Sequence, residues 1–171
     1  ITLSPDGSTS TDASVLIDGQ TVTVTQAGTY QIAGTLGDGA LIVESAENAK
    51  ITLVLGGVSI KNSTGAAIQI STADDVTIEL AEGTTNVLQS GEEVDIAAAT
   101  ESKEASGGAL QSKADLKIKG KGSLTVLGYL NNSIHCTKDL KIKNGNISVT
   151  ALGHGIKGKN SVTVSGGTVT V

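Results

Sequence analysis

Hydrophobic and polar residues alternate along most of the chain in short runs that return at a nearly constant spacing. Three equivalent runs lie at residues 116–118, 140–142 and 162–164. The repeats are therefore 24 and then 22 residues long. Two further series keep the same register, at 122–126, 145–149 and 167–171 and at 110, 134 and 156. Alternation with a period of two predicts β-strands, and three such runs in each repeat predict stacked triangular coils. The predicted fold class is all-β, a single-stranded parallel β-helix or solenoid with three short strands per coil.

Stacking of the coils predicts which residues lie over one another. Neighbouring parallel strands are about 4.8 Å apart, so equivalent residues of successive repeats form columns. The expected inward, aliphatic column consists of Ile68, Leu110, Ile134 and Ile156. The expected outward column consists of Gln69, Gln111, His135 and Lys157, which are candidate ligand-binding residues.

One elongated domain accounts for residues 1–171. Residues 1–36 are expected to form an N-terminal cap or first turn. Residues 89–108 are expected to form an inserted loop, because Ile68 and Leu110 are 42 residues apart. The chain stops within a repeat strand at Val171, so we expect the natural protein to continue. It starts without an apolar leader, so any signal peptide is expected to have been removed.

Charge divides the chain into two parts of opposite sign. Residues 1–106 carry three lysines against fifteen acidic residues, a formal charge of −12, and residues 107–171 carry nine lysines against two aspartates, a formal charge of +7. Alternation places part of the positive charge on one outer face, as a strip of Lys117, Lys119, Lys141 and Lys143. The strip favours attraction to a polyanion, although lysines on a solvated face also serve solubility alone. Nucleic acid is disfavoured, because Tyr30 and Tyr129 are the only aromatic residues.

A column of carboxylates precedes the second strand of successive repeats. Its members are Asp75, Asp115 and Asp139. Calcium, which prefers oxygen ligands, is the candidate cofactor that would offset their repulsion. Two alternatives stay open: neutralisation by Lys113 and Lys138, and hydrogen bonding of the aspartates to the turn backbone. The inserted loop offers a second candidate calcium site at Glu92, Glu93 and Asp95.

Four segments resemble one known family. They are residues 27–36, which begin Ala-Gly-Thr-Tyr, residues 51–60, residues 138–142 and the turn Gly155-Ile156-Lys157-Gly158-Lys159. Together they resemble secreted bacterial carbohydrate-binding proteins built as calcium-containing right-handed parallel β-helices, and the resemblance covers nearly the whole chain. This resemblance implies that the chain winds as a right-handed helix, that it binds calcium, and that it is secreted or located on the cell surface. It further implies binding of cellulose or of acidic plant polysaccharides such as polygalacturonate, on a fold similar to that of polysaccharide lyases.

The predicted function is that of a non-catalytic carbohydrate-binding module for plant cell-wall polysaccharide, preferentially an acidic one similar to polygalacturonate. One alternative is a calcium-dependent polysaccharide lyase, in which Lys117, Lys141 or Lys157 removes the proton beside a uronate carboxylate. Another is a structural segment of a surface adhesin. Neither nucleic acid nor membrane insertion is expected, and the oligomeric state stays open.

Overall fold

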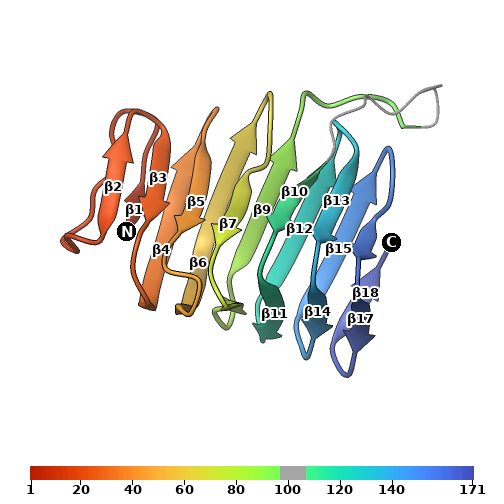
Figure 1. Ribbon diagram of the computed structural model, residues 1–171. Helices are drawn as coiled ribbons and strands as arrows, with labels where there is room; N and C mark the ends of the chain where they lie inside the picture. The colour runs from red at the N-terminus through yellow and green to blue at the C-terminus, as the bar shows by residue number, and fades with distance from the viewer. Residues whose placement is uncertain (97–106) are drawn as a thin grey trace.

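The computed structural model describes residues 1–96 and 107–171. Within these residues every regular element is a β-strand, and the strands form two sheets, one of eleven strands and one of seven (Figure 1). A search of the same residues finds no helix that is long and apolar enough to span a membrane.

The larger sheet is parallel throughout. Its strands are β1 (Thr2–Leu3), β4 (Gly28–Leu36), β6 (Lys50–Asn62), β8 (Asp75–Leu80), β9 (Thr85–Ser90), β11 (Asp115–Gly120), β12 (Ser123–Gly128), β14 (Asp139–Ile142), β15 (Asn146–Ala151), β17 (Ser161–Val164) and β18 (Thr168–Thr170). We call this the curved sheet.

The long strand β6 gives the curved sheet its shape. Residues 50–55 of β6 pair with β8, and residues 59–62 pair with β9. Gly57, which lies between these two segments, has a φ of 90°, a value that glycine adopts without the steric cost of a Cβ. From β6 the sheet therefore continues as two arms, one through β8, β11, β14 and β17 and the other through β9, β12, β15 and β18.

The smaller sheet is mixed. Its strands are β2 (Val15–Asp18), β3 (Thr21–Val24), β5 (Ala40–Glu44), β7 (Ile68–Thr72), β10 (Gly108–Ser112), β13 (Asn132–Cys136) and β16 (Ile156–Gly158). β2 and β3 pair antiparallel across a turn that contains Gly19, whose φ of 55° is left-handed. All other neighbours in this sheet are parallel.

The predicted fold class, a single-stranded right-handed parallel β-helix with three short strands per coil, is wrong. The strands belong to one curved parallel sheet and one mixed sheet, and the thirteen-residue strand β6 spans both arms of the curved sheet. A period-two pattern shows which residues share a face, but it does not show whether a strand ends or bends and continues. The pattern also carries no sign of strand direction, so it missed the antiparallel pair of β2 and β3.

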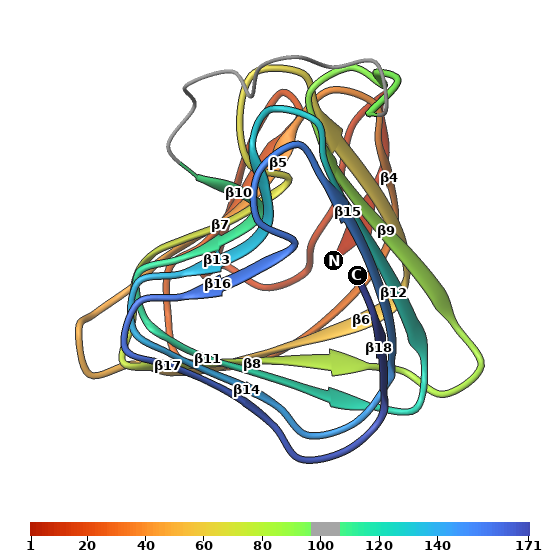
Figure 2. The ribbon, with the colours of Figure 1, turned by 90° about the vertical axis from the view of Figure 1, so that its right-hand side faces the viewer.

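The predicted register between repeats is confirmed. Leu110 is the register partner of both Ile68 and Ile134, and Ile134 is the partner of Ile156. Viewed along the stack, the repeats superimpose in outline, with the curved sheet forming two sides and the mixed sheet the third (Figure 2). Their apolar residues form one hydrophobic cluster between the sheets.

The inserted loop predicted at 89–108 stays a prediction, although strands occupy both ends of that range. Gln89 and Ser90 belong to β9, and Gly108 begins β10. Of the segment between these strands, residues 97–106 lie outside the described part of the chain. The assignments of residues 1–36 to a cap and of 1–171 to one domain stay predictions.

The Ile134 side chain provides a test of the register. It is fully buried, so Ile134→Asp is expected to prevent folding or to lower the free energy of unfolding by about 3 to 5 kcal/mol, the cost of a buried charge without a partner. The measurement is denaturant unfolding followed by circular dichroism. The control is His135→Gln, because the same outward column already holds glutamine at positions 69 and 111. A stability loss in the control as large as that of Ile134→Asp would contradict the alternation.

Candidate functional site

The predicted lysine strip lies on the outer face of the curved sheet. Lys117 of β11 is the register partner of Lys141 of β14, as the repeat pattern predicts. Lys119 follows on β11, and Lys143 comes directly after β14, where its N–H donates to the Ile118 carbonyl at 2.8 Å. Residues between these lysines are buried, so the lysine side chains share the solvent face.

Ion pairs divide this strip into two halves. The ammonium group of Lys117 lies 3.6 Å from the Asp75 carboxylate, and that of Lys119 lies 2.9 Å from Glu79. Within the described residues, Lys141 and Lys143 have no carboxylate within ion-pair distance, and both side chains are exposed. The uncompensated positive charge of the strip therefore lies at Lys141 of β14 and at Lys143 directly after it.

A surface hollow of about 450 Å³ adjoins the strip at the ends of β8, β11 and β14. Lys119, Lys121 and Lys143 line it, together with Glu79 and Glu82. Lys121, which the sequence reasoning did not select, lies 3.5 Å from Glu82. Because that pair is largely exposed, its contribution to stability is small and its members can exchange partners.

The carboxylate column is satisfied by neighbours in the next repeat. Asp75 and Asp115 are register partners, and Asp75 pairs with Lys117. The Asp115 carboxylate accepts a hydrogen bond from the Asp139 backbone N–H at 3.2 Å. The Asp139 carboxylate accepts one from the Ser161 hydroxyl at 2.8 Å. Neither of the predicted neutralising lysines, Lys113 and Lys138, forms an ion pair with the column in the described part of the chain.

The described residues contain no group of three or more His, Cys, Asp or Glu side chains that could hold one metal ion. This holds for the column Asp75, Asp115 and Asp139 and equally for the loop carboxylates Glu92, Glu93 and Asp95. In the loop, Glu92 lies 2.7 Å from the ammonium group of Lys61, and Glu93 and Asp95 follow it. Calcium at either place stays a prediction.

The second predicted ligand-binding set lies on the mixed sheet. Gln69, Gln111, His135 and Lys157 are register partners on β7, β10, β13 and β16. The predicted register of these four residues is therefore confirmed, but the column belongs to a different sheet from the lysine strip. The amide oxygen of Gln111 accepts a hydrogen bond from Gly108 N–H at 3.0 Å, and Gln69 donates to the Ser71 hydroxyl at 3.1 Å. Both glutamine side chains are therefore hydrogen-bonded to residues of their own strands.

His135 differs from its neighbours in the column, because its ring nitrogen Nδ1 is buried without a hydrogen-bond partner. Burial lowers the pKa of His135 below its ordinary value of 6.5, and the positive charges of Lys157 and His154 lower it further. The imidazole is therefore held in its neutral form near pH 7. His154 itself is exposed, and its Nδ1 lies 3.1 Å from the Asn132 amide oxygen.

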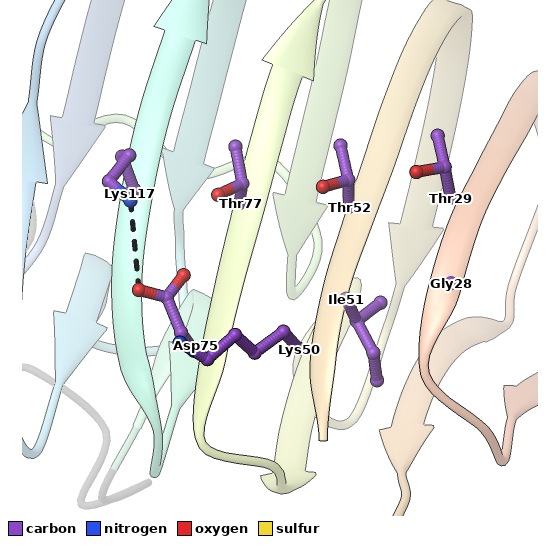
Figure 3. Close-up of a pocket in the computed structure, with 8 residues that line it drawn as sticks. All are labelled: Gly28, Thr29, Lys50, Ile51, Thr52, Asp75, Thr77 and Lys117. Carbon is purple, nitrogen blue, oxygen red and sulfur yellow. Dashed lines mark ion pairs between the residues drawn. The ribbon is translucent and has the colours of Figure 1, made fainter. Parts of the chain in front are cut away.

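A row of threonines forms a second hollow, which the sequence reasoning missed. Thr29 of β4, Thr52 of β6 and Thr77 of β8 are register partners on adjacent strands. With Lys50, Asp75 and Lys117 they line a hollow of about 380 Å³ (Figure 3). The alternating runs Ile51-Thr52-Leu53 and Val76-Thr77-Ile78 carried a signal for this row, but threonine is common in strands for its shape alone.

Comparison with known proteins places the chain in a family. The model of a family described as carbohydrate-binding domain-containing proteins matches residues 18–171. The chain belongs to this carbohydrate-binding domain family. A curated carbohydrate-binding domain-containing protein from Acetivibrio thermocellus is 40% identical over 130 residues, which are 76% of this chain and 45% of the relative. The chain therefore matches less than half of the length of that relative.

The fold of this carbohydrate-binding domain is also found in a solved structure. A polysaccharide lyase-like protein from C. thermocellum, determined as a gadolinium derivative, matches with a TM-score of 0.78 and 32% sequence identity. The match covers 94% of this chain and 75% of that chain.

The pKa of His135 predicts a pH dependence of stability. A histidine whose pKa is lower in the folded state binds fewer protons than it does in the unfolded state. Its contribution to stability is therefore present above pH 6.5 and is lost as the pH falls below that value. The free energy of unfolding of the parent protein is expected to decrease between pH 7 and pH 5.5 more steeply than that of His135→Gln. Equal slopes in denaturant titrations at these pH values would contradict the lowered pKa.

Calcium is tested by its effect on thermal stability. An ion that binds only the folded protein stabilises it by mass action, so chelator is expected to lower the melting temperature relative to millimolar calcium. The difference is expected to vanish in Asp75→Asn/Asp115→Asn if the column holds the ion, and in Glu92→Gln/Glu93→Gln if the loop holds it. Coincident melting curves of the parent protein under both conditions would rule out a stabilising calcium site.

Proposed function

We propose that this domain is a non-catalytic binding module for an acidic plant cell-wall polysaccharide of the polygalacturonate type. Membership of the carbohydrate-binding domain family supports a carbohydrate ligand. The single observation that carries the acidic preference is the exposed pair Lys141 and Lys143, which has no carboxylate within ion-pair distance in the described residues. The binding surface is the outer face of β11 and β14.

The chemistry of lysine suits a flexible, repeating polyanion. An ammonium group is a compact charge with three donors on a mobile stem, and it does not require the planar two-point geometry of arginine, which the chain lacks. Lys117 and Lys141 repeat at the spacing of neighbouring strands, about 4.8 Å. A polyuronate that crosses the strands can therefore place successive carboxylates near successive lysines.

Aromatic stacking does not contribute to this surface. Tyr30 and Tyr129 are the only aromatic residues of the chain, and both are buried. Affinity must therefore come from charge and hydrogen bonds, which are weakened by salt and by competing water. The proposed setting is outside a bacterial cell, secreted or on its surface, since a plant cell-wall polysaccharide is met there.

The test measures retention on polygalacturonate. Lys141→Gln/Lys143→Gln is expected to weaken binding about tenfold, equivalent to about 1.4 kcal/mol, and to reduce its salt dependence. One control is Lys61→Gln/Glu92→Gln, which removes a whole ion pair outside β11 and β14 without changing the net charge and is expected to leave affinity within about twofold. Another is Lys113→Gln/Lys138→Gln, which changes the net charge as much as the test variant but at positions before β11 and β14.

The outcomes separate the alternatives. Equal binding by Lys141→Gln/Lys143→Gln and the parent would contradict the proposed site. Absence of any retention of the parent protein would favour a structural segment of a surface protein. Appearance of unsaturated uronate products, followed by their ultraviolet absorbance, would favour a lyase and contradict a non-catalytic role.

A further inference from the structure

The threonine row forms the floor of a groove that crosses the strands. Thr29, Thr52 and Thr77 have short side chains, and they stand between two columns of other outward residues. The flanking columns are Gln31, Val54 and Glu79 on one side and Lys50 and Asp75 on the other. Thr77 is only 8% exposed, whereas Thr52 is partly exposed and Thr29 is exposed. The hollow, of about 380 Å³, is open to solvent along the row.

The groove continues directly into the lysine strip. The register partner of Thr77 on β11 is Lys117, and the next partners along the same row are Lys141 and then Thr163. A linear chain that crosses the strands along this row therefore meets three threonines first and two lysines afterwards. The two parts of the row lie on one continuous face of the curved sheet.

The charges around the groove differ from those of the strip. Asp75 and Glu79 lie two residues before and after Thr77, on the same face of β8. They are paired with Lys117 and Lys119, and Lys50 stands beside Asp75 on the next strand. A ligand carboxylate over Thr77 could not accept hydrogen bonds from these two carboxylates, and of the lysines that line the hollow only Lys50 has no ion pair within the described residues. A sugar hydroxyl at the same place would instead donate hydrogen bonds to them, which are stronger than bonds to neutral acceptors.

We infer that this groove binds sugar units without a free carboxylate, neutral or esterified, in the same polysaccharide whose charged units lie on Lys141 and Lys143. This inference rests on the proposed function. The full site is then a path across β4, β6, β8, β11 and β14 with an uncharged end at Thr29 and a charged end at Lys141. Its preferred ligand is a polyuronate in which a free-acid block adjoins an esterified or neutral block.

The test removes the hydroxyl groups and keeps the shape of the groove. Valine has the same branching as threonine at Cβ, so Thr29→Val/Thr52→Val/Thr77→Val preserves the strands. The probes are unesterified galacturonate trimer and polygalacturonate with methyl esters in blocks, and dissociation constants are measured by calorimetry. The variant is expected to bind the block-esterified polymer about tenfold more weakly and the trimer within about twofold of the parent.

A matched control uses the same substitutions on the other arm of the curved sheet. Thr125→Val/Thr150→Val/Thr170→Val changes three non-buried threonines of β12, β15 and β18 and is expected to leave both affinities unchanged. Thermal melting of all variants verifies that they are folded.

The possible results distinguish the groove from the lysine site. If the groove variant binds the block-esterified polymer as tightly as the parent does, the inference is overturned, while a loss in Lys141→Gln/Lys143→Gln still supports the proposed function. If the parent protein binds neither probe, the proposed function itself is wrong, and the inference about the groove fails with it.

Discussion

The in-register parallel pairing of successive repeats is the constraint on which the rest of this structure depends. Each repeat donates and accepts backbone hydrogen bonds to the next, so residues such as Ile68, Leu110 and Ile134 are fixed over one another at the spacing of neighbouring strands. An apolar residue at one position of the repeat therefore becomes a column, and the columns together form a continuous core. A polar residue at the next position becomes a row on the surface.

The same constraint brings like charges together, and the surface shows how they are accommodated. Lysines of β11 stand next to carboxylates of β8, which gives the pairs Lys117–Asp75 and Lys119–Glu79. Asp115 and Asp139 instead accept hydrogen bonds from the following repeat. Lys141 of β14 and Lys143 directly after it have no carboxylate within ion-pair distance in the described residues. The charge available to a ligand thus arises from the order of the strands and not from the number of lysines.

The curvature of the larger sheet determines which rows share a face. Because β6 passes through both arms, the threonine row and the lysine strip lie on the arm that continues through β8, β11 and β14. The column of Gln69, Gln111, His135 and Lys157 lies on the other sheet. A linear ligand that crosses the strands can follow the first set of rows from end to end, which is why the proposed site is built from them.

Alternation and repeat length in the sequence were sufficient to predict an all-β chain, the register of Ile134 with its neighbours and the outward position of Lys117 over Lys141. These properties follow from local backbone geometry, in which side chains alternate with period two and equal repeats stack in register. The tertiary structure alone decided that β6 bends instead of ending, that Asp75 neutralises Lys117, and that Thr29, Thr52 and Thr77 line one groove. These features depend on hydrogen-bond continuity and on contacts between residues from different repeats, which the spacing of residues along the chain does not specify.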